Sequence, residues 1–254
     1  MKKNSFWAVL ALLAVLTACG TSSQRQSDLD PSDVLQNQPG DSTFYGLACD
    51  GCTDTILIVL PSDGSDPDTF DILEAMRSRQ VFGRPQIGDR LALFRNRLDT
   101  CVADIVIDID QLKGQWCYQV TPRLRRWAGM SDSAQQVPPP SMPDSIRRKL
   151  FQPRELGIQL NGDGTARPIG SVPRAKSSDE RSPVEFPPQK RYHEWRIVNG
   201  RLLLNETSLD SLGNTIVTGS DTARLVLLRR DTLVLRIDGV EQGYYRKRTE
   251  ELNN

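Results

Sequence analysis

Two cysteines with two residues between them, Cys49 and Cys52, have the spacing in this chain that is best suited to chemistry. Two sulfurs on one tight turn can hold a soft metal ion such as Cu(I) or Zn(II), or can pass between thiol and disulfide states. A redox-catalytic thiolate needs a helix N-terminus to stabilise it, but the residues after this motif, 55–60, are strand-like. Asp50 adds a negative charge that also disfavours a thiolate. Catalytic disulfide exchange is therefore not expected here.

The N-terminal segment predicts export. Lys2 and Lys3 precede an apolar run, Phe6–Leu16, which is too short to span a bilayer. The run leads into Leu16-Thr17-Ala18-Cys19, which resembles the lipobox of bacterial lipoproteins. The resemblance implies cleavage before Cys19 and attachment of acyl chains such as palmitate to it, and two or more chains anchor a protein durably in a membrane. Residues 1–18 are thus predicted to be a lipoprotein signal peptide.

The residues after Cys19 predict a flexible tether and the membrane in which the protein is anchored. Residues 20–41 hold Ser, Thr, Gln, Asp and Pro, with too few apolar side chains to offset the entropy of ordering the chain. We therefore interpret 19–41 as a flexible tether. Gly20 does not match the Asp-type signal that retains lipoproteins in the inner membrane, and no acidic cluster follows Cys19. We expect an anchor in the outer membrane, with the protein facing the periplasm.

Besides Cys19, the chain has four cysteines, Cys49, Cys52, Cys101 and Cys117. An even number in an exported chain favours two disulfides, among which three pairings are possible. We predict Cys49–Cys52 and Cys101–Cys117. The alternative is a metal site at Cys49 and Cys52, which the other two cysteines could complete, although the second pair lacks the close spacing of a zinc ribbon.

The charge balance and the histidine content argue against two further classes of function. Removal of the signal peptide would leave 30 basic residues against 32 acidic ones, which provides no attraction for nucleic acid. His193 is the only histidine, and no Gly-x-Ser-x-Gly motif supplies a nucleophile. Because His193 shares a predicted strand face with Trp195 and Ile197, we expect a packed core histidine. The chain is predicted to be neither an enzyme nor a nucleic-acid-binding protein, and no cofactor is expected.

From residue 42 onward the pattern predicts an all-β fold in two parts. Over 42–110, short strands at regular spacing favour a small OB-like barrel. Its last strand alternates isoleucines with aspartates, among them Asp108 and Asp110, which we place on a solvated face. Over 111–249, alternating strands and tight turns such as Asn199-Gly200 predict an antiparallel meander, interrupted by a long Pro-rich loop at 129–153.

The second part resembles the lipocalin-like domains of bacterial lipoproteins. Its matching features follow the order of that family: Leu112-Lys113-Gly114-x-Trp116, Leu156-Gly157-Ile158-x-Leu160, Tyr192-x-x-Trp195, Asn199-Gly200-Arg201-Leu202 and Leu233-x-Leu235. The resemblance covers about half of the chain, and it implies an up-and-down barrel that holds a small apolar ligand. On this basis Trp116, Trp195 and Tyr244 are predicted to line the cavity.

A shorter segment, Tyr45-Gly46-Leu47-Ala48-Cys49-Asp50-Gly51-Cys52, resembles NlpE-type envelope lipoproteins, which are linked to copper tolerance and stress sensing. The leading hypothesis is a membrane-anchored, non-catalytic module that binds a small apolar ligand or a protein partner in the envelope. The alternative is a metal-responsive or redox-sensing envelope factor that acts through Cys49 and Cys52.

Overall fold

The computed structural model of the chain describes residues 39–125, 142–170 and 183–247, all of which belong to one compact unit of the chain. The predicted signal peptide (1–18), the predicted lipidation site Cys19, residues 19–38 of the predicted tether and residues 129–141 of the Pro-rich loop lie outside the described residues. Among the residues that are described, no helix combines the length and the apolar character needed to cross a membrane.

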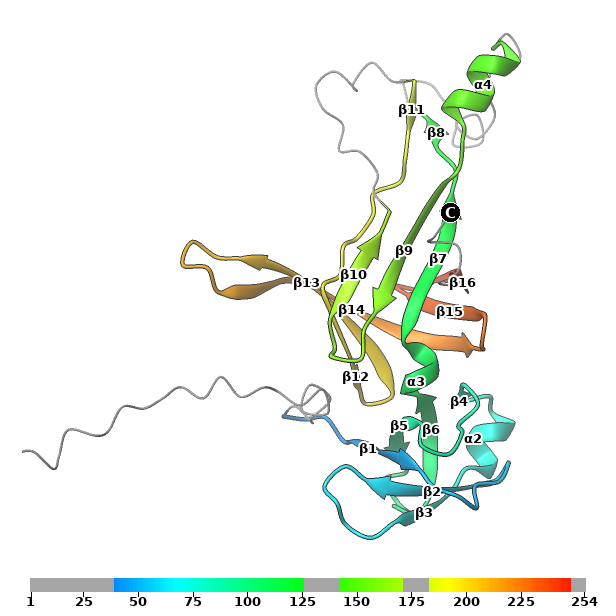
Figure 1. Ribbon diagram of the computed structural model, residues 1–254, viewed down its shortest axis with the longest axis vertical. Coiled ribbons are helices and arrows are strands. Elements are labelled where there is room, and N and C mark those ends of the chain that lie inside the picture. The colour runs from blue at the N-terminus through cyan, green and yellow to red at the C-terminus, as the bar shows by residue number, and fades with distance from the viewer. Residues whose placement is uncertain (1–38, 126–141, 171–182, 248–254) are drawn as a thin grey trace, which may run out of the picture. The chain divides into compact units, whose positions relative to one another are not determined.

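The N-terminal sheet has six strands in the order β3-β2-β1-β5-β6-β4 (Figure 1). Neighbouring strands are antiparallel except β4 and β6, which are parallel. A short helix, α2 (Leu73–Arg77), lies between β3 and β4 in the chain. The strands are β1 (Thr43–Ala48), β2 (Ile56–Pro61), β3 (Asp68–Asp71), β4 (Val81–Phe82), β5 (Arg90–Arg95) and β6 (Ala103–Asp108).

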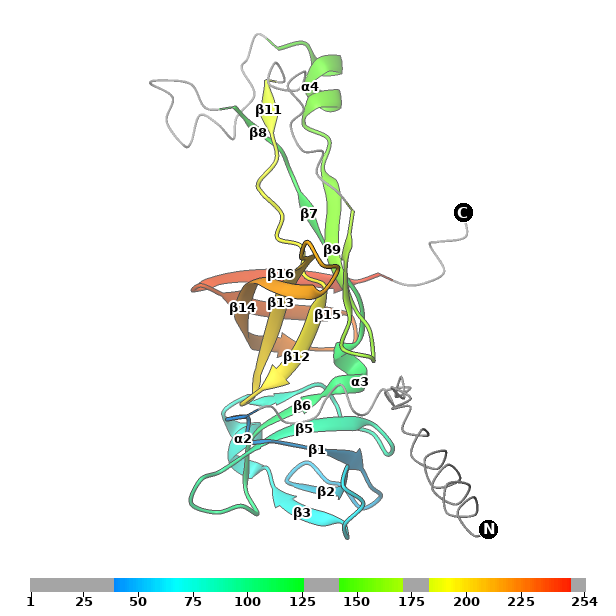
Figure 2. The ribbon, with the colours of Figure 1, turned by 90° about the vertical axis from the view of Figure 1, so that its left-hand side faces the viewer.

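Eight antiparallel strands form a nearly closed barrel in the order β10-β9-β7-β16-β15-β14-β13-β12 (Figures 1 and 2). The ends of this order, β10 and β12, are joined by backbone hydrogen bonds from Ala166 to His193 (2.7 Å) and from Trp195 to Gly164 (2.8 Å). The strands are β7 (Gly114–Val120), β9 (Arg154–Leu160), β10 (Ala166–Ile169), β12 (Glu194–Val198), β13 (Arg201–Leu209), β14 (Thr215–Leu228), β15 (Thr232–Ile237) and β16 (Val240–Arg246).

Four short elements complete the described fold. The one-turn helix α3 (Ile109–Leu112) connects β6 to β7, and β8 (Arg123–Leu124) pairs with β11 (Val184–Glu185). Helix α4 (Asp144–Leu150) precedes β9. Pro143 holds its N-cap position, and Asp144 lies in its first turn, paired with Arg147 at 2.6 Å.

One apolar core extends from the N-terminal sheet into the barrel. Phe82, Ala92 and Ile107 of the six-stranded sheet belong to the same cluster of buried side chains as Trp116 and Trp195 of the barrel. The other face of that sheet packs on a second cluster, which includes Leu57, Phe70, Leu91, Leu93 and Val106. The central strands of the six-stranded sheet are therefore covered on both faces.

The expectation of an all-β fold is confirmed, because strands dominate the described residues and helices are few. The turn predicted at Asn199-Gly200 is also confirmed, since both residues have positive φ (49° and 72°) and connect β12 to β13. Positive φ at both central positions is typical of a two-residue hairpin turn, for which Asn-Gly is a preferred pair.

The prediction that Asp108 faces solvent is wrong. Asp108 is 1 % exposed, because β6 ends there between the two cores and the chain continues into α3. Its carboxylate accepts a hydrogen bond from the Gln111 N–H (2.8 Å) and so caps the helix. Burial, with added repulsion from Asp89 and Asp110, raises the pKa of Asp108 to about 6 despite this hydrogen bond.

Candidate functional site

The Cys49–Cys52 motif lies between β1 and β2, where both side chains are half-buried. The Cys52 thiol donates to the Cys49 carbonyl oxygen (3.2 Å) and accepts a hydrogen bond from the Ile58 N–H (3.3 Å). Both residues are free thiols, and the described part of the chain contains no group of three or more His, Cys, Asp or Glu side chains that could hold a metal ion. The disulfide and the metal site at this motif stay predictions.

The other predicted pair, Cys101 and Cys117, is also present as free thiols. Cys101 is exposed before β6, whereas Cys117 is buried in β7. Burial, reinforced by the Glu155 carboxylate, raises the pKa of the Cys117 thiol to about 11. Such a thiol is protonated at neutral pH and is therefore a poor nucleophile. No disulfide joins the two residues in the structure, and their pairing stays a prediction.

The aromatic residues predicted to line a ligand cavity are held by contacts within the protein. Trp116 and Trp195 are 0 % and 1 % exposed, and their indole N–H groups donate to the carbonyl oxygens of Leu112 (2.7 Å) and Asn161 (2.9 Å). Tyr244 is half-buried and packs edge-on against Tyr118, with 5.2 Å between ring centroids. None of the three predicted residues lines the pocket described below.

His193 is exposed, so the prediction of a core histidine is wrong. The alternation that contains Trp195 does not extend back to it, because β12 begins only at Glu194. The imidazole Nδ1 accepts a hydrogen bond from the Thr207 N–H (3.2 Å) on the neighbouring strand. Tyr192 occupies the buried position instead, and its hydroxyl donates to the Asp221 carboxylate (2.6 Å).

Helix α3 forms a first joint between the six-stranded sheet and the barrel. Its last carbonyl groups accept hydrogen bonds from barrel side chains, since Arg246 donates to Gln111 and to Lys113 (2.7 Å) and Trp116 donates to Leu112. The Arg246 guanidinium also lies over the Trp116 ring, 4.1 Å from its centroid, in a cation–π contact. The carbonyl groups that a helix end leaves unpaired are thus satisfied by the barrel.

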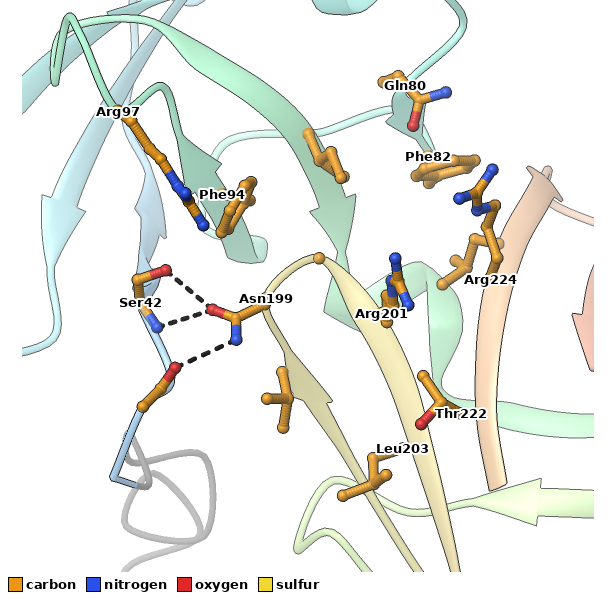
Figure 3. Close-up of a pocket in the computed structure, with 15 residues that line it drawn as sticks. Ser42, Gln80, Phe82, Phe94, Arg97, Asn199, Arg201, Leu203, Thr222 and Arg224 are labelled. Atoms are coloured by element: carbon orange, nitrogen blue, oxygen red, sulfur yellow. Dashed lines mark hydrogen bonds between the residues drawn. The ribbon is translucent and has the colours of Figure 1, made fainter. Parts of the chain in front are cut away.

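The hairpin turn at Asn199 forms a second joint (Figure 3). The Asn199 side-chain oxygen accepts hydrogen bonds from the Ser42 N–H (3.0 Å) and hydroxyl (2.8 Å), and its amide group donates to the Gly40 carbonyl (3.1 Å). The Asn199 N–H donates to the Asp41 carboxylate (3.0 Å). A turn of the barrel is therefore bound to the segment that leads into β1.

The next residue of the turn brings the two sheets into direct contact. A Cβ atom on Gly200 would lie 2.6 Å from Ile105 Cδ1 and 3.4 Å from Phe94 Cβ. In addition, the Tyr45 hydroxyl donates to the Ile197 carbonyl (2.6 Å). Close packing at Gly200 and polar contacts on either side hold the hairpin against β1, β5 and β6.

A pocket of about 650 Å³ lies beside this turn (Figure 3), within the size range of small-molecule sites. One wall comes from the N-terminal sheet and includes Phe82, Phe94 and Ile105. The opposite wall comes from β12, β13 and β14 and includes Leu203 and Thr222. Along these strands the side chains of Trp195, Leu202, Leu204 and Ala223 are buried in the barrel, so residues at alternate positions form the outer surface that borders the pocket.

The polar lining of the pocket is cationic. Arg97, Arg201 and Arg224 border it, together with neutral polar groups such as Gln80 and Asn199, whereas no Asp or Glu does. Sequence reasoning missed these residues because they come from segments far apart in the chain. The available signal was Asn199-Gly200-Arg201, which marks a hairpin but does not reveal what the outer side of that hairpin contacts.

Comparison with known proteins identifies no relative: no protein-family model, curated protein or solved structure matches the chain.

Proposed function

We propose that this chain is a lipid-anchored, non-catalytic binding protein of the outer membrane that faces the periplasm and holds a small molecule in the pocket beside Asn199-Gly200. The observation that supports this function is the position of the pocket. Both sheets contribute to it, and it lies beside the hydrogen bonds between Ser42 and Asn199 and the close packing at Gly200. The barrel interior, by contrast, contains the buried side chains of Trp116 and Trp195.

The finer features of the fold belong to the same proposal. A lipocalin-like barrel is supported by the strand order, because β13 to β16 pair in sequence order and β16 pairs back with β7. An OB-like N-terminal barrel is supported by a parallel bridge between Asp71, at the end of β3, and Val102, just before β6. This bridge brings the β3 edge of the six-stranded sheet toward β6, which lies next to the opposite edge.

The anchor is tested by replacing the residue that would carry the lipid. In bacterial cells that process lipoproteins, the wild-type chain should remain with the outer-membrane fraction, and Cys19→Ser should appear in the soluble periplasmic fraction. The mass of the wild-type protein should exceed that of the chain from Cys19 onward by the added acyl groups. An unmodified mass or a soluble wild-type protein would contradict the lipid anchor.

The binding function is tested by filling the pocket without touching the barrel interior. Thr222 borders the pocket on β14, whereas Thr218 is an exposed residue of the same strand outside it. Native mass spectrometry of protein purified from the envelope should detect a small-molecule adduct on the wild type and on Thr218→Trp, but not on Thr222→Trp. An adduct that persists in Thr222→Trp, or a wild type that takes up nothing from an envelope extract, would overturn the proposal.

A further inference from the structure

We infer that the ligand of this pocket carries an anionic group, a carboxylate or a phosphate, on a small apolar body, and that Arg201 and Arg224 bind the anionic group. This inference rests on the proposed function and names the chemistry of its ligand. It combines the register of the barrel strands, the absence of partners for two arginines and the apolar wall that faces them.

The strand register places three arginines side by side. Leu202 pairs with Ala223 and Leu203 with Thr222, so Arg201 at the start of β13 lies opposite Arg224 on β14. Arg224 is in turn the register partner of Arg236 on β15. Like charges directly opposite one another destabilise a sheet, so the fold itself gains nothing from this row.

Only one member of this row has an acidic partner in the structure. Arg236 donates to the Glu241 carboxylate through Nε (3.1 Å). Within the described ranges, Arg201 and Arg224 form no ion pair and no side-chain hydrogen bond, and no carboxylate borders the pocket beside them. An anion between the two guanidinium groups would relieve their repulsion and accept charge-assisted hydrogen bonds from both.

The rest of the pocket requires an apolar body on the same ligand. In Figure 3, Arg201 and Arg224 extend from adjacent strands on one side of the hairpin turn, toward the wall that carries Phe82. Ile105 and Leu203 add aliphatic surface to the walls. A volume of about 650 Å³ exceeds the space that a bare inorganic anion would occupy. The paired charges of Arg201 and Arg224 on one wall, with apolar surface beside them, fit an amphipathic anion.

The test compares three probes that separate charge from apolar surface. Isothermal titration calorimetry of the purified protein with octanoate should detect binding, whereas octanamide, which has the same chain without the charge, should bind at least about tenfold more weakly. Acetate, which has the charge without the chain, should also bind at least tenfold more weakly. Equal affinity for octanoate and octanamide would overturn the anionic assignment and leave the proposed binding function standing.

Matched variants test which arginines bind the anionic group. Arg201→Gln and Arg224→Gln should each weaken octanoate binding at least about fivefold and leave octanamide binding unchanged. Arg236→Gln, in the same row but outside the pocket, should bind octanoate like the wild type. If Arg236→Gln weakened binding as much as Arg224→Gln, a general surface charge would explain the effect and the assignment would be wrong.

A further arm distinguishes a free amphiphile from a membrane headgroup. Sedimentation with phosphatidylglycerol vesicles, using phosphatidylcholine vesicles as the neutral control, should show no association that depends on Arg224. Association with the anionic vesicles that is lost in Arg224→Gln, without octanoate binding, would overturn the inference in favour of a lipid surface. Binding of neither octanoate nor vesicles would also overturn it. Whether the pocket binds any ligand is decided separately, by an adduct that is present on Thr218→Trp and absent from Thr222→Trp.

Discussion

The two faces of the strands β12, β13 and β14 differ in burial, in packing and in charge. Toward the barrel interior they present Trp195, Leu202, Leu204 and Ala223, which are buried in the shared core. Toward the N-terminal sheet they present Arg201, Leu203, Thr222 and Arg224, which border a pocket. The buried polar group on the inner face, the Trp195 indole, has a partner, whereas Arg201 and Arg224 on the outer face have none among the described residues.

This comparison separates the face that stabilises the fold from the face on which we propose that a ligand binds. In a strand with alternating faces, one face can satisfy the packing of the fold while the other is free to vary. Here the inner face is complete without a ligand, and the outer face has open volume and unneutralised charge. The resemblance to lipocalin-like domains predicts a cavity in the barrel interior, but the pocket found among the described residues lies on the outside of the barrel.

The largest loss of stability should come from truncating a buried side chain on the inner face. We expect Trp195→Ala to lower the free energy of unfolding by about 3–5 kcal/mol, because it removes a fully buried ring and leaves a cavity. Leu203→Ala, on the outer face of the adjacent strand, should cost about 1 kcal/mol. Urea denaturation measures both. Similar losses at the two positions would break the distinction between a packing face and a binding face.

The next effect separates a structural arginine from a surface one. Arg246→Ala should lower the free energy of unfolding by about 2–3 kcal/mol, because it removes charged hydrogen bonds to α3 and the contact with Trp116. Arg236→Ala, which breaks an exposed ion pair with Glu241, should cost at most about 1 kcal/mol. Thermal unfolding of both variants would test this difference, and equal shifts in Tm would contradict the role assigned to the α3 joint.

The hairpin joint can be probed with two glycines in the same kind of turn. Gly200 and Gly239 both have positive φ (72° and 82°), so alanine should cost about 1–2 kcal/mol at either position. Only Gly200 contacts the other sheet, whereas a Cβ on Gly239 would meet nothing within 4 Å. Gly200→Ala should therefore cost about 1 kcal/mol more than Gly239→Ala and should also reduce ligand binding. Equal losses of unfolding free energy for Gly200→Ala and Gly239→Ala in chemical denaturation would show that the hairpin is not closely packed against Ile105.

A separate effect concerns the dependence of stability on pH. The pKa of Asp108 is raised from 3.8 to about 6 in the folded protein, so the native state holds this proton more tightly than the unfolded chain does. The contribution of Asp108 to stability is therefore greatest below pH 3.8 and falls by about 3 kcal/mol as the pH rises through about 6. Asp108→Asn, which keeps a capping side chain, should remove this fall. If the unfolding free energy of Asp108→Asn fell between pH 3.8 and pH 6 as much as that of the wild type, this assignment to Asp108 would be wrong.

Sequence patterns predicted the local elements well. Alternation of apolar and polar residues marks β9, β12 and β15, and Asn199-Gly200 marks its hairpin, because each depends on side chains only a few positions apart. The same reasoning failed at Asp108 and His193. At Asp108 it did not anticipate that a second core covers the strand, and at His193 it extended a strand face beyond the start of β12.

The candidate site depends on contacts that no local pattern contains. Ser42 and Asn199 are 157 positions apart in the chain. Arg201 and Arg224 become neighbours only once the register of β13 and β14 is known. The cysteine motif is conspicuous in the sequence because its spacing is local, whereas the arginines are scattered among the chain's many charged residues.

The most direct test is to observe which face of the barrel responds when a ligand binds. In a ¹⁵N–¹H NMR titration with octanoate, the backbone amides of Gly200, Arg201 and Arg224 should shift, while the indole N–H signals of Trp116 and Trp195 should remain in place. Shifts of the two indole signals with unmoved amides at the hairpin would place the ligand inside the barrel and contradict a binding site on its outer face.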